Sequence, residues 1–261
     1  IKRSLSFFVM GGIVLVFFLA CKVVAAEEKI YFASGAVRNI LVELFTSDVS
    51  PTGNPALEWM TGLMAKESDG TLWKKVVPIA MHVHAWDIPG QKDTFGRPEY
   101  DERLLAYKKK WSAGRVYCPT VVTNGADWSG WSRQQPFQPE TEVVGELIAD
   151  GTEKEGLFKV SFKPAKGGGA DGFTIHGALV AFGLRSKPSE GKNRGKSLQH
   201  DFISLIYRAN DLLLVRGGEL TSSIELARPK GVRIQRYAAV FWVTKKGDVV
   251  PLQATGGYLP Y

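Results

Sequence analysis

Two histidines separated by one residue have the type and spacing for metal chemistry. His82 and His84 stand at the end of an apolar run, Val76–Val83, that predicts a buried strand. Alternate side chains of a strand point to the same face, so the two imidazoles would share a face. With Asp87 they could offer two nitrogens and a carboxylate to a transition metal. The alternative is a polar cluster that ties the strand end to the following loop.

Cys118 is another residue whose side chain could take part in chemistry. The chain has two cysteines, and the other, Cys21, lies in an apolar N-terminal segment, so a disulfide between them is not expected. A lone thiol could capture a partner thiol or a soft metal, but it cannot complete a disulfide cycle without a second cysteine. The alternative is that Cys118 is a small buried hydrophobic residue.

Composition and motifs exclude several functions. The net charge is +7, but residues 1–26 hold three basic residues and no acidic one, which leaves 30 basic against 26 acidic residues in the remainder. No cluster of Lys and Arg alternates with aromatic residues, which argues against nucleic-acid binding. The sequence has no Gly-x-Ser-x-Gly, phosphate-loop or dinucleotide-binding motif, and it indicates no cofactor.

The residues around these side chains predict alternating strands and helices. The apolar run Val37–Phe45 predicts a buried strand, and Asn54-Pro55 predicts the start of a helix that reaches about Lys66. Further helices are expected over Pro98–Trp111 and Pro139–Ala149. Trp128 and Trp131 lie in a hairpin-like segment, where they would either pack in the core or form an interaction surface.

After Gly151 the pattern changes to strands separated by turn signals. Glycine-rich and polar turns separate these apolar runs, which favours a mostly antiparallel β domain over 152–261. The expected strands are Leu157–Phe162, Phe173–Leu184, Phe202–Tyr207, Val232–Val243 and Val249–Gly257.

One stretch, Leu41–Ala56, resembles the central motif of a known family. This is the secreted bacterial thioredoxin-like family called domain of unknown function 1223, whose members typically read V-E-L-F-T-S-Q-G-C-S-S-C-P-P-A. Val42 to Ser47 match letter for letter, and Pro55-Ala56 match again. The residues from Gly191 to His200 resemble a second family motif, R-G-E-N-x-G-R-x-L-x-H. The resemblance covers nearly all of 37–258.

The resemblance implies an α/β thioredoxin-like domain over 27–151 with a degenerate site. The family's two cysteine positions are occupied by Ser50 and Gly53, which can neither attack a disulfide nor form one. In the family a cis-proline faces this loop, and the matching residue is Pro119, after Cys118. The expected degenerate site is therefore Ser50, Gly53, Cys118 and Pro119.

Residues 1–26 have the pattern of an export segment. Lys2 and Arg3 precede a long apolar run, which predicts an N-terminal apolar helix. The segment is either a signal peptide cleaved after Val24-Ala25-Ala26, or an anchor that crosses the membrane through residues 4–24, or a lipidated terminus at Cys21. Under all three alternatives the bulk of the chain is exported, so the protein is expected to be periplasmic, anchored in the inner membrane or secreted.

Two functions follow as hypotheses. In the first, the chain is a redox-inactive accessory or assembly subunit that binds protein partners in a larger membrane or periplasmic complex. In the second, it is a periplasmic metal or thiol handler that uses Cys118 and the pair His82 and His84. Dithiol oxidoreductase activity is not expected, because both cysteine positions are substituted.

Overall fold

The computed structural model describes residues 29–50, 53–84, 92–152, 156–165, 172–189, 192–214, 219–229 and 234–260. The expected N-terminal apolar helix over residues 1–26 lies outside these ranges. No helix in the described ranges is long and apolar enough to cross a membrane.

The described strands form two large sheets and one small hairpin. The larger sheet has eight strands in the order β15 (Pro251–Tyr258), β14 (Arg236–Lys245), β8 (Phe173–Phe182), β11 (Ile203–Asp211), β3 (Val76–His82), β2 (Ile40–Thr46), β4 (Thr120–Thr123) and β5 (Ala126–Asp127). The second has five, in the order β1 (Lys29–Ala33), β6 (Gly145–Thr152), β7 (Leu157–Pro164), β13 (Leu220–Glu225) and β12 (Leu213–Leu214). The hairpin pairs β9 (Leu184–Ser186) with β10 (Leu198–His200).

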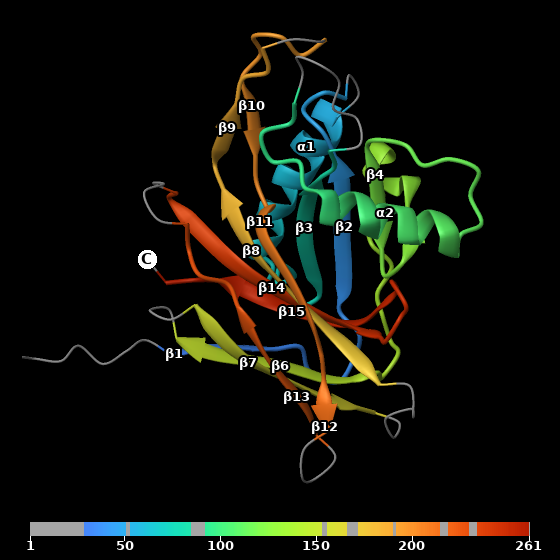
Figure 1. The fold of residues 1–261 in the computed structure, drawn as a ribbon, viewed down its shortest axis with the longest axis vertical. Coiled ribbons are helices and arrows are strands. Elements are labelled where there is room, and N and C mark those ends of the chain that lie inside the picture. Colours follow the sequence, from blue (N-terminus) through green and yellow to red (C-terminus); the bar gives the residue numbers. More distant parts are fainter. Residues whose placement is uncertain are drawn as a thin grey trace, which may run out of the picture.

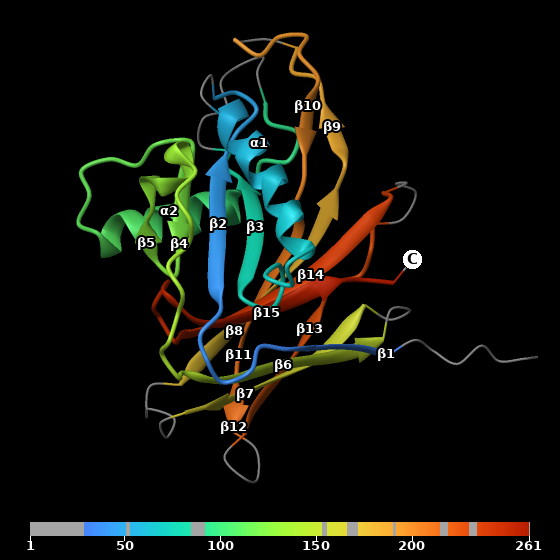
Figure 2. The same ribbon diagram turned by 180° about the vertical axis from the view of Figure 1, so that it is seen from behind.

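Two α-helices and two short 3-10 helices complete the described part of the chain. They are α1 (Gly53–Gly62), η1 (Leu63–Glu67), α2 (Pro98–Lys110) and η2 (Ser129–Arg133). The helix α2 crosses in front of β2 in Figure 1, and α1 lies in front of β3 in Figure 2, which is viewed from behind. The two helices therefore cover opposite faces of the β2–β3 part of the sheet. Their buried side chains, which include Met60 and Tyr107, pack into the same core as these strands.

The long strands β8 and β14 separate two hydrophobic cores. On β14, Val240 and Trp242 face the core beneath the helices, whereas Ala239 and Phe241 face the five-stranded sheet. Neighbouring residues of a strand point to opposite faces, so a strand that is covered on both sides must be apolar throughout. This explains the unbroken apolar run from Tyr237 to Val243. The five-stranded sheet has the alternating burial of a sheet with one solvent-facing side.

The expected α/β thioredoxin-like domain followed by a separate β domain is wrong. The local order of strand, helix, strand, helix and strand over residues 40–123 is present, but these strands form one end of the eight-stranded sheet. The strand β3 pairs with β2 on one side and, through Ala80 and Ile203, with β11 on the other. The chain is thus mostly β, because apolar strands of the C-terminal half complete the sheet.

The helix expected over Pro139–Ala149 is also wrong. Residues from Gly145 onward form β6, whose buried positions alternate with exposed ones. Leu147 and Ala149 are fully buried, whereas Glu146 and Asp150 are exposed. This period of two is typical of a strand, and pairing with β1 and β7 outweighs the helical preference of the segment.

Candidate histidine–carboxylate site

The site forms where β2 and β3 end side by side. These strands are parallel, and their register pairs Thr46 with His82. His82 is the last residue of β3, and Asp48 lies two residues after the end of β2. The carboxyl ends of parallel strands meet at one edge of a sheet, so the fold places the two side chains together. Both are buried, and His82 is fully enclosed.

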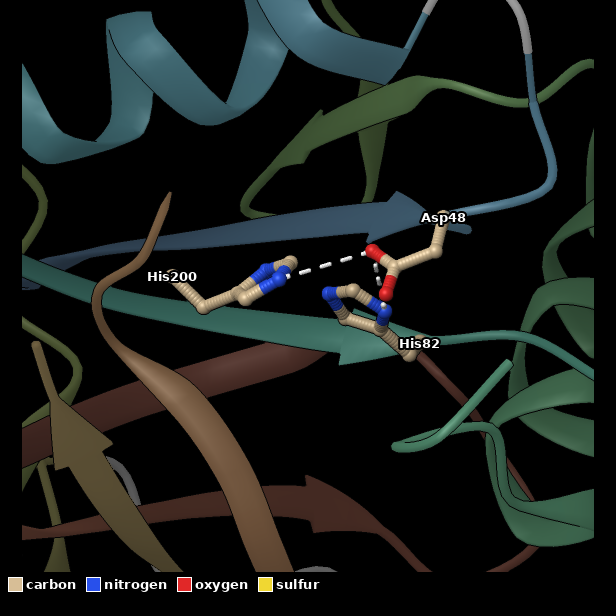
Figure 3. Close-up of side chains that lie close together, drawn as sticks. All are labelled: Asp48, His82 and His200. Atoms are coloured by element: carbon tan, nitrogen blue, oxygen red, sulfur yellow. Dashed lines mark ion pairs between the residues drawn. The ribbon is translucent and has the colours of Figure 1, made fainter. Parts of the chain in front are cut away.

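His200 joins this pair from the distant hairpin β9–β10. It ends β10, and its Nε2 lies 3.5 Å from Oδ1 of Asp48 and 2.8 Å from Oγ of Ser186. The rings of His82 and His200 meet edge to face with centroids 5.0 Å apart. Figure 3 shows both imidazoles beside the carboxylate of Asp48. Phe95 closes the group with ring contacts to both histidines.

A second carboxylate, Asp93, fixes the orientation of His82. Nδ1 of His82 lies 2.9 Å from Oδ2 and 3.1 Å from Oδ1 of Asp93. The backbone N–H groups of Asp48 and Phe95 donate to the same carboxylate at 2.6 and 2.8 Å. Asp93 therefore acts as an anchor between the end of β2 and the end of β3. We refer to Asp48, His82, Asp93 and His200 as the histidine cluster.

The charges in the histidine cluster are strongly coupled. Burial opposes ionisation of Asp93, but the charge and hydrogen bond of His82 outweigh it and lower its pKa to about 2. Burial likewise disfavours the charge of His82, yet Asp93 and Asp48 together raise its pKa. Burial raises the pKa of Asp48, against the charge of His82. Burial and the charge of His82 lower the pKa of His200 to about 3. The carboxylates thus raise the pKa of His82, whereas burial and His82 lower that of its neighbour His200.

Three atoms of the cluster have no hydrogen-bond partner among the described residues. They are Nε2 of His82, Nδ1 of His200 and Oδ1 of Asp48, and all three are buried. Buried polar atoms are paired in most proteins, and each one left unpaired costs roughly 1–3 kcal/mol. Two imidazoles and one carboxylate in an enclosed site are a donor set for a transition metal.

The two stretches that carry the family resemblance meet at this site. The side-chain amide of Asn193, which is fully buried, donates hydrogen bonds to the backbone oxygens of Asp48 and Ser50, both at 3.0 Å. One stretch supplies Asp48 and the other supplies Asn193 and His200. The amide of Asn193 therefore holds the loop after β2 against the segment that leads into β10.

The degenerate site lies next to this loop. The bond between Cys118 and Pro119 is cis, so that expectation is confirmed. Oγ of Ser50 donates a hydrogen bond of 2.8 Å to the backbone oxygen of Cys118. Burial raises the pKa of the Cys118 thiol to about 12. Gly53 begins α1 at the end of the same loop. The Ser50 loop and the Pro119 turn are thus in contact, and the nearby thiol is protonated at neutral pH.

The expected pairing of His82 with His84 is not formed. His84 lies beyond the end of β3 with a side chain that is 51% exposed, and its Nδ1 lies 2.5 Å from Asp101 of α2. His82 is turned inward to Asp93. The strand ends at His82, so the two-residue period that would align the imidazoles no longer applies. Asp87, the third expected ligand, lies outside the described residues.

The matching family model covers most of the chain. The model described as protein of unknown function (DUF1223) matches residues 41–244. The chain belongs to this family. Both Asp48, near the start of the matched region, and His200 lie within it. A search of the curated proteins finds no match.

Two solved structures share the fold. A protein of Agrobacterium tumefaciens, solved by a structural genomics consortium, is 16% identical over 86% of this chain and 98% of its own, with a TM-score of 0.55. HBP35 of Porphyromonas gingivalis is 13% identical over 87% of this chain and 76% of its own, with a TM-score of 0.56. At these identities the likeness concerns the fold alone.

The sequence predicts one member of the histidine cluster, His82, and misses the other three. His200 is far away in the sequence, and only the resemblance of its segment to a family motif connects it with the loop after β2. Asp48 follows a matched motif, but nothing in its spacing distinguishes it from a loop residue. Asp93 has no signal, because it lies 11 residues after His82 and no spacing pattern links the two.

Proposed function

We propose that this chain is a redox-inactive binding protein, an accessory or assembly subunit of a larger membrane or periplasmic complex. The observation that carries the proposal is the hydrogen bond between the side chain of Ser50 and the backbone of Cys118. A serine hydroxyl donates there to a backbone oxygen, at the position where the resemblance places an attacking thiol. This arrangement can hold two loops together, but it cannot exchange a disulfide.

The proposed location is outside the cytoplasm. The support is the pattern of residues 1–26, whose basic start and apolar run are typical of an export signal or a membrane anchor. The chain would then bind its protein partners in the periplasm or at the outer face of the inner membrane.

A cavity of about 610 Å³ beside α1 is the proposed contact region for a protein partner. Its lining includes Trp59, Trp131 and Phe137, which are partly buried against the core. The ring centroids of Trp59 and Trp131 lie 6.3 Å apart. Partly exposed aromatic side chains around a hollow are enriched at the energetic centre of protein interfaces.

Purification of the tagged full chain from native membranes in mild detergent tests this function. We expect a stoichiometric partner to co-purify with the unaltered chain and to be lost from Trp131→Ala. Tyr31→Ala is the matched control, because Tyr31 is a 60% exposed aromatic residue on β1 in the other sheet. A chain that purifies alone from native membranes, or equal loss of the partner from both variants, would contradict the proposal.

The thiol of Cys118 should react very slowly in the folded protein. A pKa of about 12, against an ordinary value of 9.0, reduces the thiolate fraction at pH 8 by about a thousandfold. We expect the alkylation rate to fall by at least that factor relative to the same chain in denaturant. Mass spectrometry in a Cys21→Ser background measures it, since only Cys118 then reports. Alkylation of the folded chain at the rate of a free peptide thiol would show that the thiol is available for chemistry.

A further inference from the structure

We propose that Asp48, His82 and His200 bind one divalent first-row transition ion, for which zinc is the reference. The inference goes beyond the proposed binding function, and it uses residues other than the expected set of His82, His84 and Asp87. Asp93 is a positioning residue in this site. The proposal rests on convergence, orientation and burial of the donor atoms.

The donor atoms already converge. One ligand atom from each of the three residues lies within 4.8 Å of the others. With metal–ligand bonds of about 2.0–2.2 Å, two ligands of one ion lie about 3–4 Å apart. Oδ1 of Asp48 lies 3.5 Å from Nε2 of His200, which is in that range. Small side-chain rotations would therefore bring all three donors within bonding distance of one ion.

His82 is oriented as a metal ligand. Its Nδ1 is engaged by Asp93, so the nitrogen that can meet an ion is Nε2, which has no partner in the described part of the chain. A carboxylate that holds one nitrogen of a histidine while the other binds the metal is a recurring arrangement in metalloproteins. Backbone N–H groups of Asp48 and Phe95 hold Asp93 in place. Binding at Nε2 would displace the proton of His82.

Burial and charge favour an ion at this place. Each of the three proposed ligands has an exposed fraction of 3% or less. An ion would satisfy Nε2 of His82 and Oδ1 of Asp48, which have no hydrogen-bond partner among the described residues. Its two positive charges would balance Asp48 and Asp93 once both histidines are neutral.

The ligand types select the class of ion. Two imidazoles with one carboxylate suit zinc, cobalt, nickel or ferrous iron, whereas magnesium and calcium prefer sites made of oxygen alone. Oγ of Ser186, which lies 2.8 Å from Nε2 of His200, is a neighbouring oxygen that could serve as a further donor. Three protein ligands leave at least one position for such an oxygen or for water.

Titration of the purified full chain with zinc, after removal of metals by a chelator, tests the site. Calorimetry should show one saturable ion per chain, and cobalt should give the visible absorption of an ion with nitrogen ligands. Asp48→Asn and His200→Gln should each weaken zinc binding by at least about tenfold, and Asp93→Asn by about 10- to 100-fold. Magnesium should not compete.

His84→Gln is the matched control, because the side chain of His84 is half exposed and its Nδ1 lies 2.5 Å from Asp101 of α2. Circular dichroism should show that the Asp48→Asn and His200→Gln variants remain folded. If one variant is unfolded, the zinc affinity of the other variant and the cobalt spectrum of the unaltered chain test the site. The proposal is overturned if the unaltered chain takes up no stoichiometric zinc, if both variants bind zinc as the unaltered chain does, or if His84→Gln abolishes binding.

Discussion

Replacing Arg103 with methionine is expected to lower the free energy of unfolding by about 3–5 kcal/mol. Nε of Arg103 lies 2.5 Å from Oε1 of Glu43, a carboxylate that is fully buried in the middle of β2. Tyr107 donates to the other carboxylate oxygen at 2.5 Å. Removing the guanidinium leaves a charged carboxylate inside the protein without its counter-ion. Urea denaturation monitored by circular dichroism measures the loss.

The double variant Glu43→Gln/Arg103→Met separates loss of packing from the unpaired charge. The Glu43→Gln change retains an acceptor for Tyr107 but removes the charge, so we expect the double variant to be more stable than Arg103→Met alone. A double variant less stable than Arg103→Met would show that the cost comes from packing, including the contacts of Arg103 over the rings of Tyr107 and Trp242. This pair also explains why a glutamate stands in the otherwise apolar run Leu41–Phe45.

His176→Gln should remove part of the acid sensitivity of the protein. His176 lies on β8, stacks on Trp242, and its ring nitrogens contact the hydroxyls of Tyr207 and Thr244 at 2.8 and 3.0 Å. Burial, with a contribution from the charge of Arg103, lowers its pKa well below the ordinary value. The unfolded chain therefore takes up a proton below about pH 6.5 that the folded chain does not bind, and folding loses about 1.4 kcal/mol per pH unit.

Denaturation curves at pH 7.5, 5.5 and 4.5 (about one and two units below the unfolded pKa) measure this effect. The stability difference between the unaltered chain and His176→Gln should shift in favour of the variant as the pH falls. Titrating groups that the two proteins share cancel in the difference. Tyr207→Phe is the control: it removes one hydrogen bond at every pH but keeps the buried histidine, so its pH dependence should follow the unaltered chain. Parallel curves for His176→Gln and the unaltered chain would contradict the prediction.

Local sequence signals predict the strands and turns around the site better than they predict which strands pair with one another. The strands near Val42 and Ile79, and the cis bond at Pro119, are predicted correctly because each depends on apolar runs or a motif within a few residues. The pairing of β3 with β11 is not predicted, because the sequence of an apolar strand that is covered on both faces does not indicate which strands lie beside it. His200 reaches Asp48 only through that pairing and the hairpin that precedes it.

For the same reason the sequence of β6 suggests a helix. Residues 145–152 combine acidic and apolar residues in a short run, for which helical and strand periods are hard to tell apart. The partner β1, which lies more than a hundred residues away in the sequence, settles the period by pairing Phe32 with Ala149. Information of this kind is carried by tertiary contacts and cannot be recovered from a local window.

The central position of β3 has a consequence for biosynthesis. A growing chain emerges from its N-terminus, so β2, β3 and β4 become available well before β11, the strand that covers the remaining edge of β3. During that interval a buried-type apolar strand presents unpaired backbone N–H and C=O groups, which is the template on which chains aggregate. Folding dominated by such long-range pairing is slow. A chaperone that shields nascent β strands would therefore act on this protein between the synthesis of β3 and that of β11.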